Sequence, residues 1–178
     1  MKNQSIQTSI SIRPGNSTDI SAVLDIASTW LSAFDPEGKN VNGFLFGTAY
    51  TEEDLLRIIE SEDIAVALYQ EKEVVGYFLV DNFSNNPTSR LYRQHLKALL
   101  PGKERVCPRA QIAIKEAYQG MGISGRLTAF LKESVNSRYD AIFSIVSLQN
   151  PKMPVHEKAG WQVLGKNDDF YFVMLALK

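Results

Sequence analysis

Residues 110–125 decide the fold, and they read Ala-Gln-Ile-Ala-Ile-Lys-Glu-Ala-Tyr-Gln-Gly-Met-Gly-Ile-Ser-Gly. The apolar run at 110–114 predicts a strand, and the apolar spacing over residues 123–136 predicts a helix. Between them, Gly120 and Gly122 allow a tight turn that brings backbone N–H groups close to a ligand. The helix N-terminus adds unpaired N–H donors and the positive end of its dipole. The stretch therefore predicts a strand–turn–helix unit that binds an anion such as phosphate or pyrophosphate.

The glycines of this turn are open to other interpretations. Gly120, Gly122 and Gly125 also spell G-x-G-x-x-G, the fingerprint of dinucleotide-binding folds. Such a fold begins with the motif and needs further βα units, with an acidic residue about 20 positions on at the end of a strand. Less than a third of the chain follows Gly125, and the nearest candidate acid, Asp140, falls at the start of a strand. No Lys-Ser or Lys-Thr follows the glycines, which argues against a Walker A loop. A plain turn with glycines for packing stays open.

Apolar periodicity along the rest of the chain predicts six further strands. They cover residues 6–13, 64–69, 74–80, 141–148, 161–164 and 170–177. Helices are expected to start at Ser17 or Thr18, at Thr51 and near Ser89, with a short one before Gly160. This order mixes hairpins with one βαβ crossover. It predicts a single α/β domain over residues 1–178, of the mixed-sheet (α+β) kind, with helices on the sheet faces.

Composition limits the function classes. The 178 residues carry 19 Lys and Arg against 20 Asp and Glu, which argues against a general nucleic-acid binder. Cys107 is the single cysteine, so an internal disulfide is excluded. No apolar stretch approaches the roughly 18 residues of a membrane span, and residues 1–9 lack the apolar segment of a secretory signal. We therefore expect a cytoplasmic protein with no nucleic-acid and no membrane partner.

The segment Gln119-Gly120-Met121-Gly122-Ile123-Ser124 resembles the acyl-CoA pyrophosphate loop, Q/R-x-x-G-x-G/A, of the GNAT superfamily of N-acetyltransferases. Ser124 replaces the last small residue of that loop, and its hydroxyl could add a phosphate contact. The resemblance covers nearly the whole chain, because the expected β-α-α-β-β start and the later segments follow the family's order. It implies a central, mostly antiparallel sheet of about seven strands flanked by helices.

Two segments depart from the family pattern. Family members usually connect the third and fourth strands by a short turn, whereas residues 82–108 form an insert with its own expected helix. Residues 150–161, Asn-Pro-Lys-Met-Pro-Val-His-Glu-Lys-Ala-Gly-Trp, are similar to the motif N-x-x-A…Y-E-K-x-G-F but one residue shorter. Counted back from Gly160, His156 occupies the position where the family usually has tyrosine.

The resemblance implies direct attack of a primary amine on the thioester of acetyl-CoA, which serves as co-substrate. The residues expected to bind it are Ile112, Ala113, Ile114, Gln119, Gly120, Met121, Gly122, Ile123, Ser124, Gly125 and Asn150. His156 is the candidate acid for the departing thiolate, because imidazole titrates near neutrality; Tyr118 is the fallback. No metal site is predicted and no general base is identified, although Gln111, Ser144 or Ser147 could orient a water molecule.

Two further functions remain compatible with these residues. The altered acid position and the missing base are consistent with a non-catalytic acyl-CoA-binding module or sensor. A phosphate- or nucleotide-binding regulator would use the same glycine turn. The acceptor stays unidentified, although Asp35 and Glu37 could meet a cationic amine. The chain is expected to be a monomer or a homodimer.

The insert is locally basic, with Arg90, Arg93 and Lys97 on one face of its expected helix. This face could form a lid over an acidic acceptor or over the ribose phosphate of CoA. A solvated helix face is the favoured interpretation.

Overall fold

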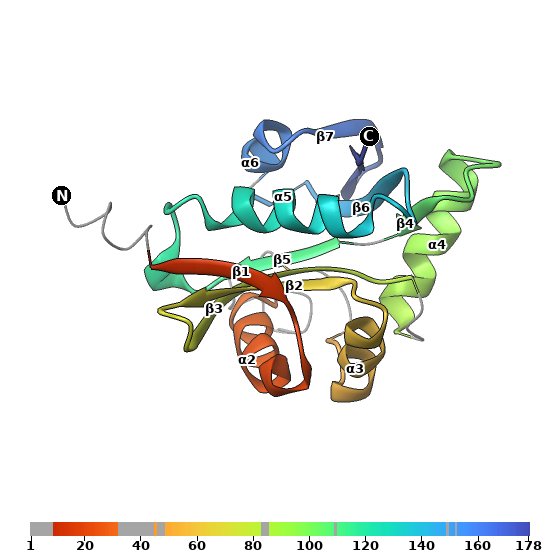
Figure 1. The fold of residues 1–178 in the computed structure, drawn as a ribbon. Helices are drawn as coiled ribbons and strands as arrows, with labels where there is room; N and C mark the ends of the chain where they lie inside the picture. Colours follow the sequence, from red (N-terminus) through yellow and green to blue (C-terminus); the bar gives the residue numbers. More distant parts are fainter. Residues whose placement is uncertain are drawn as a thin grey trace.

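Two four-stranded sheets organise the molecule (Figure 1). The computed structural model describes residues 9–31, 45, 49–82, 86–108, 110–148, 150–151 and 153–178. The first sheet has the order β1-β2-β3-β5, formed by β1 (Ile10–Pro14), β2 (Ile64–Tyr69), β3 (Glu73–Val80) and β5 (Ala110–Ile114). The second has the order β4-β6-β8-β7, formed by β4 (Val106–Pro108), β6 (Ala141–Ser147), β8 (Phe170–Ala176) and β7 (Trp161–Lys166). The helices are η1 (Ser17–Asp19), α2 (Ile20–Trp30), α3 (Glu52–Glu60), α4 (Pro87–Leu99), η2 (Glu116–Tyr118), α5 (Ile123–Val135) and α6 (Met153–Lys158).

Helices cover both faces of the first sheet. α2 and α3 pack on one face and α5 on the other (Figure 1). Because successive side chains of a strand point to opposite faces, β2 directs Ala65 and Ala67 to the core under α5, and Val66 and Leu68 to the core under α2 and α3. The continuous apolar run at 64–69 thus belongs to a strand buried on both faces.

The two sheets separate where the chain passes from β4 to β5. β4 pairs parallel to β6, with Val106 opposite Ala141 and Pro108 opposite Phe143. β5 begins two residues after Pro108 and pairs antiparallel to β3 instead, with Ala110 opposite Val80. β5 and β6 therefore diverge beyond Phe143, and each has an edge that faces the other without strand pairing between them.

The predicted α/β class is confirmed, but the expected single sheet of about seven strands is corrected. The described residues form eight strands in two sheets. The additional strand is β4, which lies inside the predicted insert 82–108. Three residues are too few for a periodic signal, and one of them is Pro108, which a strand tolerates at a sheet edge such as this one. Residues 6–8 of the first predicted strand lie outside the described residues.

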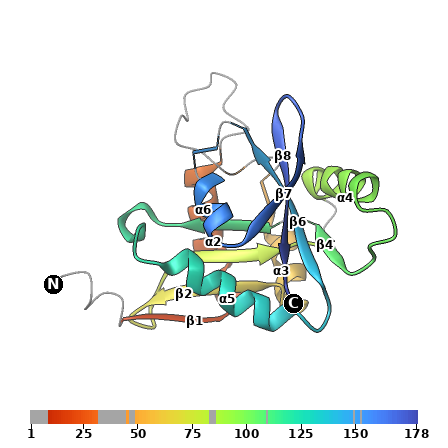
Figure 2. The ribbon, with the colours of Figure 1, turned by 90° about the horizontal axis from the view of Figure 1, so that it is seen from above.

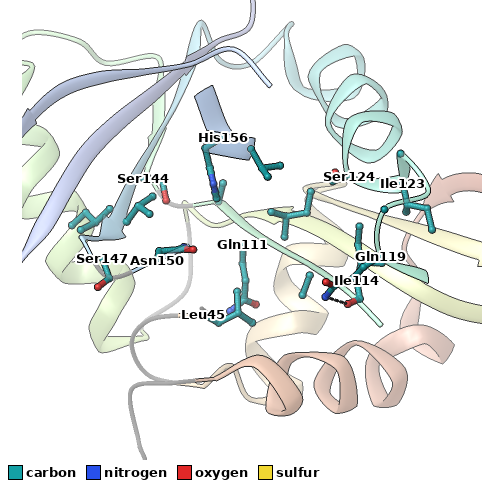
Figure 3. A pocket seen from close by; sticks show the side chains of 18 of the residues that line it. Leu45, Gln111, Ile114, Gln119, Ile123, Ser124, Ser144, Ser147, Asn150 and His156 are labelled. Atoms are coloured by element: carbon teal, nitrogen blue, oxygen red, sulfur yellow. Dashed lines mark hydrogen bonds between the residues drawn. The ribbon is translucent and has the colours of Figure 1, made fainter. Parts of the chain in front are cut away.

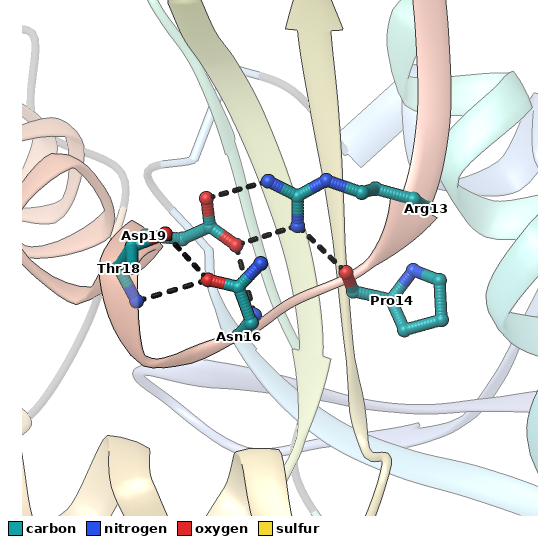
Figure 4. Close-up of polar contacts among 5 residues, drawn as sticks. All are labelled: Arg13, Pro14, Asn16, Thr18 and Asp19. Carbon is teal, nitrogen blue, oxygen red and sulfur yellow. Dashed lines mark hydrogen bonds and ion pairs between the residues drawn. The ribbon is translucent and has the colours of Figure 1, made fainter. Parts of the chain in front are cut away.

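Asn16, rather than Ser17 or Thr18, caps the first helical segment (Figure 4). Its side-chain oxygen accepts a hydrogen bond from Thr18 N at 2.9 Å, and the Asp19 carboxylate accepts one from Asn16 N at 2.8 Å, which is a capping box. The Arg13 guanidinium donates to both carboxylate oxygens of Asp19, at 2.7 and 2.9 Å. These bonds join the end of β1 to the start of α2.

α4, in the insert, packs on the outer face of the second sheet (Figure 2). Tyr92 and Leu96 are buried there, whereas Leu99 is 39% exposed. Leu100 takes the packing position instead, because positions four apart share a helix face. No helix in the described part of the chain is long and apolar enough to cross a membrane.

Candidate functional site

A cleft of about 400 Å³ lies between β5 and β6, where the two sheets separate (Figure 3). Its walls are strand residues, one end is the turn before α5, and α6 contributes Val155 and His156. The residues predicted to bind acyl-CoA that line it are Ile112, Ala113, Ile114, Gln119, Gly120, Gly122, Ile123, Ser124 and Asn150. Met121 packs against the core under α5, and Gly125 is exposed on the first turn of α5, so neither is among the lining residues.

The hydrogen-bond pattern of β5 determines which backbone groups face the cleft. Lys115 N donates to Val75 O at 2.9 Å, and Ile114 lies opposite Gly76. Hydrogen-bonded and non-hydrogen-bonded pairs alternate along an antiparallel ladder. The backbone groups of Ala113 are therefore directed to β3, and those of Ile112 and Ile114 are directed away from it, into the cleft.

The hydrogen bonds between β6 and β8 likewise determine which backbone groups of β6 face the cleft. Leu148 N donates to Asp169 O at 2.9 Å, which directs the backbone groups of Ile145 and Ser147 away from β8. The Tyr92 hydroxyl donates to Ile145 O at 3.0 Å, and Asn150 N donates to Ser147 O at 3.0 Å. The insert thus contributes Tyr92 to this wall of the cleft.

The turn before α5 has the shape expected of a phosphate-binding loop. Gly120 and Gly122 have φ of +77° and +75°, and a Cβ added at either would meet no atom within 4 Å. Gly122 is the residue that precedes the first turn of α5. In an α-helix the first N–H groups have no partner within the helix, so those of Ile123 and Ser124 are oriented toward the turn. An open, left-handed glycine turn in front of helix N–H donors fits a pyrophosphate.

His156 and Gln111 lie on opposite sides of β5 (Figure 3). His156 is half-buried on α6, and its ring packs edge-on against Trp161 with centroids 6.0 Å apart. Gln111 is 4% exposed and, like Ala113, faces the α2 and α3 side of the sheet. Its side-chain oxygen accepts a hydrogen bond from the buried hydroxyl of Tyr77 at 2.8 Å.

Tyr118, the fallback acid, is directed away from the cleft. Its hydroxyl donates to Glu73 Oε2 at 3.0 Å, and its ring contacts Tyr69. Burial and this carboxylate raise the pKa of the phenol. Tyr118 does not line the cleft, and neither does Glu116, which is exposed.

The basic face of α4 also lies outside the lining of the cleft. Arg90 and Lys97 are exposed, and the Arg93 guanidinium donates to Asn82 O at 3.4 Å. Ser144 and Ser147 do line the cleft. Asp35 and Glu37, the acids expected to meet a cationic amine, fall outside the described residues.

Sequence reasoning missed Tyr92, Leu45 and Val155 as lining residues. The place of Tyr92 in the cleft depends on how α4 packs against the edge of β6. Leu45 forms an isolated bridge with Leu31, and no pattern in the neighbouring sequence predicts this bridge. These positions follow from tertiary packing alone.

Known acetyltransferases resemble this chain in structure. No protein-family model and no curated protein matches the sequence. A putative acetyltransferase of Salmonella typhimurium, solved with its cofactor acetyl-CoA, superposes with a TM-score of 0.64 and 15% identity, covering 96% of this chain and 95% of that one. A ribosomal-protein-alanine N-acetyltransferase of Brucella melitensis gives 0.63 and 17%, covering 93% and 99%.

A GNAT-family acetyltransferase of Listeria monocytogenes gives a TM-score of 0.64 with 13% identity, covering 94% of each chain. Each likeness extends over almost the full length of both proteins, so it concerns the whole architecture and not one motif. The chain therefore has the fold of the GNAT superfamily of acetyltransferases.

Proposed function

We propose that the protein transfers an acetyl group from acetyl-CoA to a primary amine. The observation that carries this proposal is the cleft between β5 and β6, which ends at the open glycine turn before α5. The turn would bind the pyrophosphate, and the edges of the strands would hold the pantetheine arm. The structural neighbours, a putative acetyltransferase and a ribosomal-protein-alanine N-acetyltransferase, support the same assignment.

The backbone of β5 would act on the thioester. The N–H of Ile112 or that of Ile114, both directed into the cleft, can donate to the carbonyl oxygen as negative charge develops there. Because positions two apart on a strand are separated by about 6.6 Å, the other N–H would bond to the pantetheine arm. The ladder directs the N–H of Ala113 to β3, so Ala113 would contribute its position in the wall and not a donor. Asn150, whose backbone N–H is bonded to Ser147 O, would offer its side chain to the pantetheine.

His156 would protonate the departing sulfur. In the overall reaction a carbon–nitrogen bond forms, the carbon–sulfur bond breaks, the amine loses a proton and the thiol of CoA leaves protonated. A protonated imidazole is an N–H donor and can supply that proton. His156 lines the cleft, and the phenol of Tyr118 is bonded to Glu73 outside it. This favours His156 over Tyr118.

The proposal is tested by ligand binding followed by turnover. CoA and acetyl-CoA should raise the melting temperature, while ATP and NAD at equal concentration should not, because they lack the pantetheine arm. Thiol release from acetyl-CoA should then depend on an added amine. Binding of CoA with no thiol release for any amine of a broad panel would favour the alternative, a non-catalytic acyl-CoA-binding module. Stabilisation by ATP or NAD and not by CoA would favour a nucleotide-binding regulator.

A further inference from the structure

Gln111 presents hydrogen-bond donors to the cleft. Its side chain is 4% exposed and lines the cleft on the α2 and α3 side of β5. The carboxamide oxygen is occupied by the hydroxyl of Tyr77, which is fully buried and donates to it at 2.8 Å. The NH₂ group therefore points the other way, and it has no partner among the residues that the structure describes.

This orientation excludes one role and favours another. A carboxamide nitrogen donates hydrogen bonds and does not accept a proton, so Gln111 cannot serve as a base through this end. It cannot bind the attacking amine either. A protonated amine has only donors, and the lone pair of a neutral amine must point at the thioester carbon. The NH₂ group of Gln111 must meet a different oxygen of the ligand.

That oxygen must lie close to the reacting amine. Gln111 is the neighbour of Ile112, whose N–H is directed into the cleft, and one residue of strand spans only about 3.3 Å. Gln111 and His156 lie on opposite sides of β5 (Figure 3). The thiol would leave on the His156 side, so the acceptor would approach from the Gln111 side.

We propose that Gln111 donates a hydrogen bond to a carbonyl oxygen next to the acceptor amine, which makes the acceptor an α-amine of an amino acid or of the first residue of a peptide. This inference rests on the proposed acetyl transfer. An α-amine also arrives neutral more readily, because its pKa is about 7.7–8.0 against about 10.4 for a lysine amine. The polar side chains that line the described part of the cleft, which are amides, hydroxyls and an imidazole, suit such an acceptor.

The test compares acceptors that differ only in the group that carries this carbonyl, a carboxamide in one and a methyl group in the other. The fastest of a panel of amino acid amides is paired with the alkylamine that lacks the carboxamide, for example alaninamide with isopropylamine. Gln111→Met keeps the length of the side chain and removes both N–H donors. We expect its kcat/KM to fall on the order of 10-fold for the amide and to stay unchanged for the alkylamine. KM for acetyl-CoA should also stay unchanged. Because each acceptor is compared between variant and wild type, the different amine pKa values cancel.

The outcomes separate this inference from the proposed function. An equal loss of kcat/KM with both acceptors would mean that Gln111 acts on the thioester or only on the fold. An unchanged kcat/KM with both acceptors would mean that Gln111 does not bind the acceptor. Both results overturn the proposal. Wild-type protein that acetylates another amine of the broad panel but no α-amine overturns the inference and leaves the proposed function standing. Wild-type protein that acetylates no amine of that panel refutes the proposed function, and the inference falls with it. Free alanine and an alanine-initiated peptide, measured in the same way, distinguish the two sources of the acceptor.

Two further variants serve as an alternative to Gln111→Met and as a control for the added charge. Gln111→Glu keeps an oxygen for the Tyr77 hydroxyl and serves if Gln111→Met does not fold. It should likewise lower the preference for the amide, and an unchanged preference overturns the proposal. Gln162→Glu, at an exposed position of β7, adds the same charge outside the cleft and should leave both rates unchanged.

Discussion

A valine at Gly122 tests whether the turn before α5 binds the phosphates of CoA. Gly122 has φ +75°, and an added Cβ would meet no atom within 4 Å. The change therefore costs backbone strain without an internal clash, about 1–2 kcal/mol for a side chain in the left-handed region. In the complex, however, the valine would stand between the phosphate and the N–H groups of Ile123 and Ser124. A hydrogen bond to a charged group contributes about 1.5–3 kcal/mol, so losing one should weaken CoA binding roughly 10- to 100-fold.

Gly102 supplies a matched control. It has φ +76° and nothing within 4 Å of an added Cβ, but it follows α4 and does not line the cleft. Both valine variants should lose similar stability, seen as a fall in melting temperature of about 2–8 °C. Only Gly122→Val should lose affinity for CoA in isothermal titration calorimetry. A folded Gly122→Val protein with wild-type affinity would refute the phosphate-binding role of the turn.

Three further predictions concern the acid, a buried carboxylate and the insert. His156→Ala should lower kcat on the order of 10²-fold with CoA affinity unchanged, and His156→Tyr should retain more activity; steady-state rates equal to wild type in the alanine variant would exclude the acid role. Burial raises the pKa of Asp63 to about 6 from 3.8. Between these two pH values the native state binds a proton that the unfolded chain releases. The stabilisation of the native state by this proton is complete below pH 3.8 and is lost as the pH rises through about 6. Denaturant titrations measure the difference in unfolding free energy between the wild type and Asp63→Asn. This difference should favour the wild type by about 1 kcal/mol more at pH 5 than at pH 7, and parallel pH profiles of the two free energies would contradict this. Charge reversal at Arg90 and Lys97, both exposed, should change CoA affinity by less than about 1 kcal/mol, and a larger, salt-dependent loss would mean that this face reaches the ligand.

The fold was predictable where local chemistry determines it. The strand at 110–114, the glycine turn and the helix from Ile123 were predicted because their signals lie within one short stretch. The cap was misplaced by one or two positions, since Asn16 acts only together with Asp19 and Arg13. β4 was missed because its pairing depends on a strand more than 30 residues away, and no local pattern encodes it.

The glycine turn of the site could be predicted from the sequence, but the directions of the polar side chains near the reacting groups could not. Glycines with positive φ leave a residue-type signature, so the turn could be recognised before its geometry was known. The direction of the Gln111 carboxamide could not be inferred, because it is determined by Tyr77 on another strand. The Tyr118 hydroxyl is directed out of the cleft by Glu73, a contact between residues 45 positions apart.

Two aromatic side chains hold β5 and β6 apart by bonding carbonyls on their facing edges. Trp30 on α2 donates its indole N–H to Ile114 O at 3.0 Å, and Tyr92 on α4 donates its hydroxyl to Ile145 O at 3.0 Å. Both carbonyls are directed into the gap, where two free strand edges would otherwise tend to pair. Each edge instead has a carbonyl bonded to a helix from a different layer, which opposes closure and leaves the backbone of Ile112 facing the cleft. The insert therefore helps to keep the cleft open. Without α4, the carbonyl of Ile145 would lose its bond to Tyr92 and could pair with a neighbouring strand.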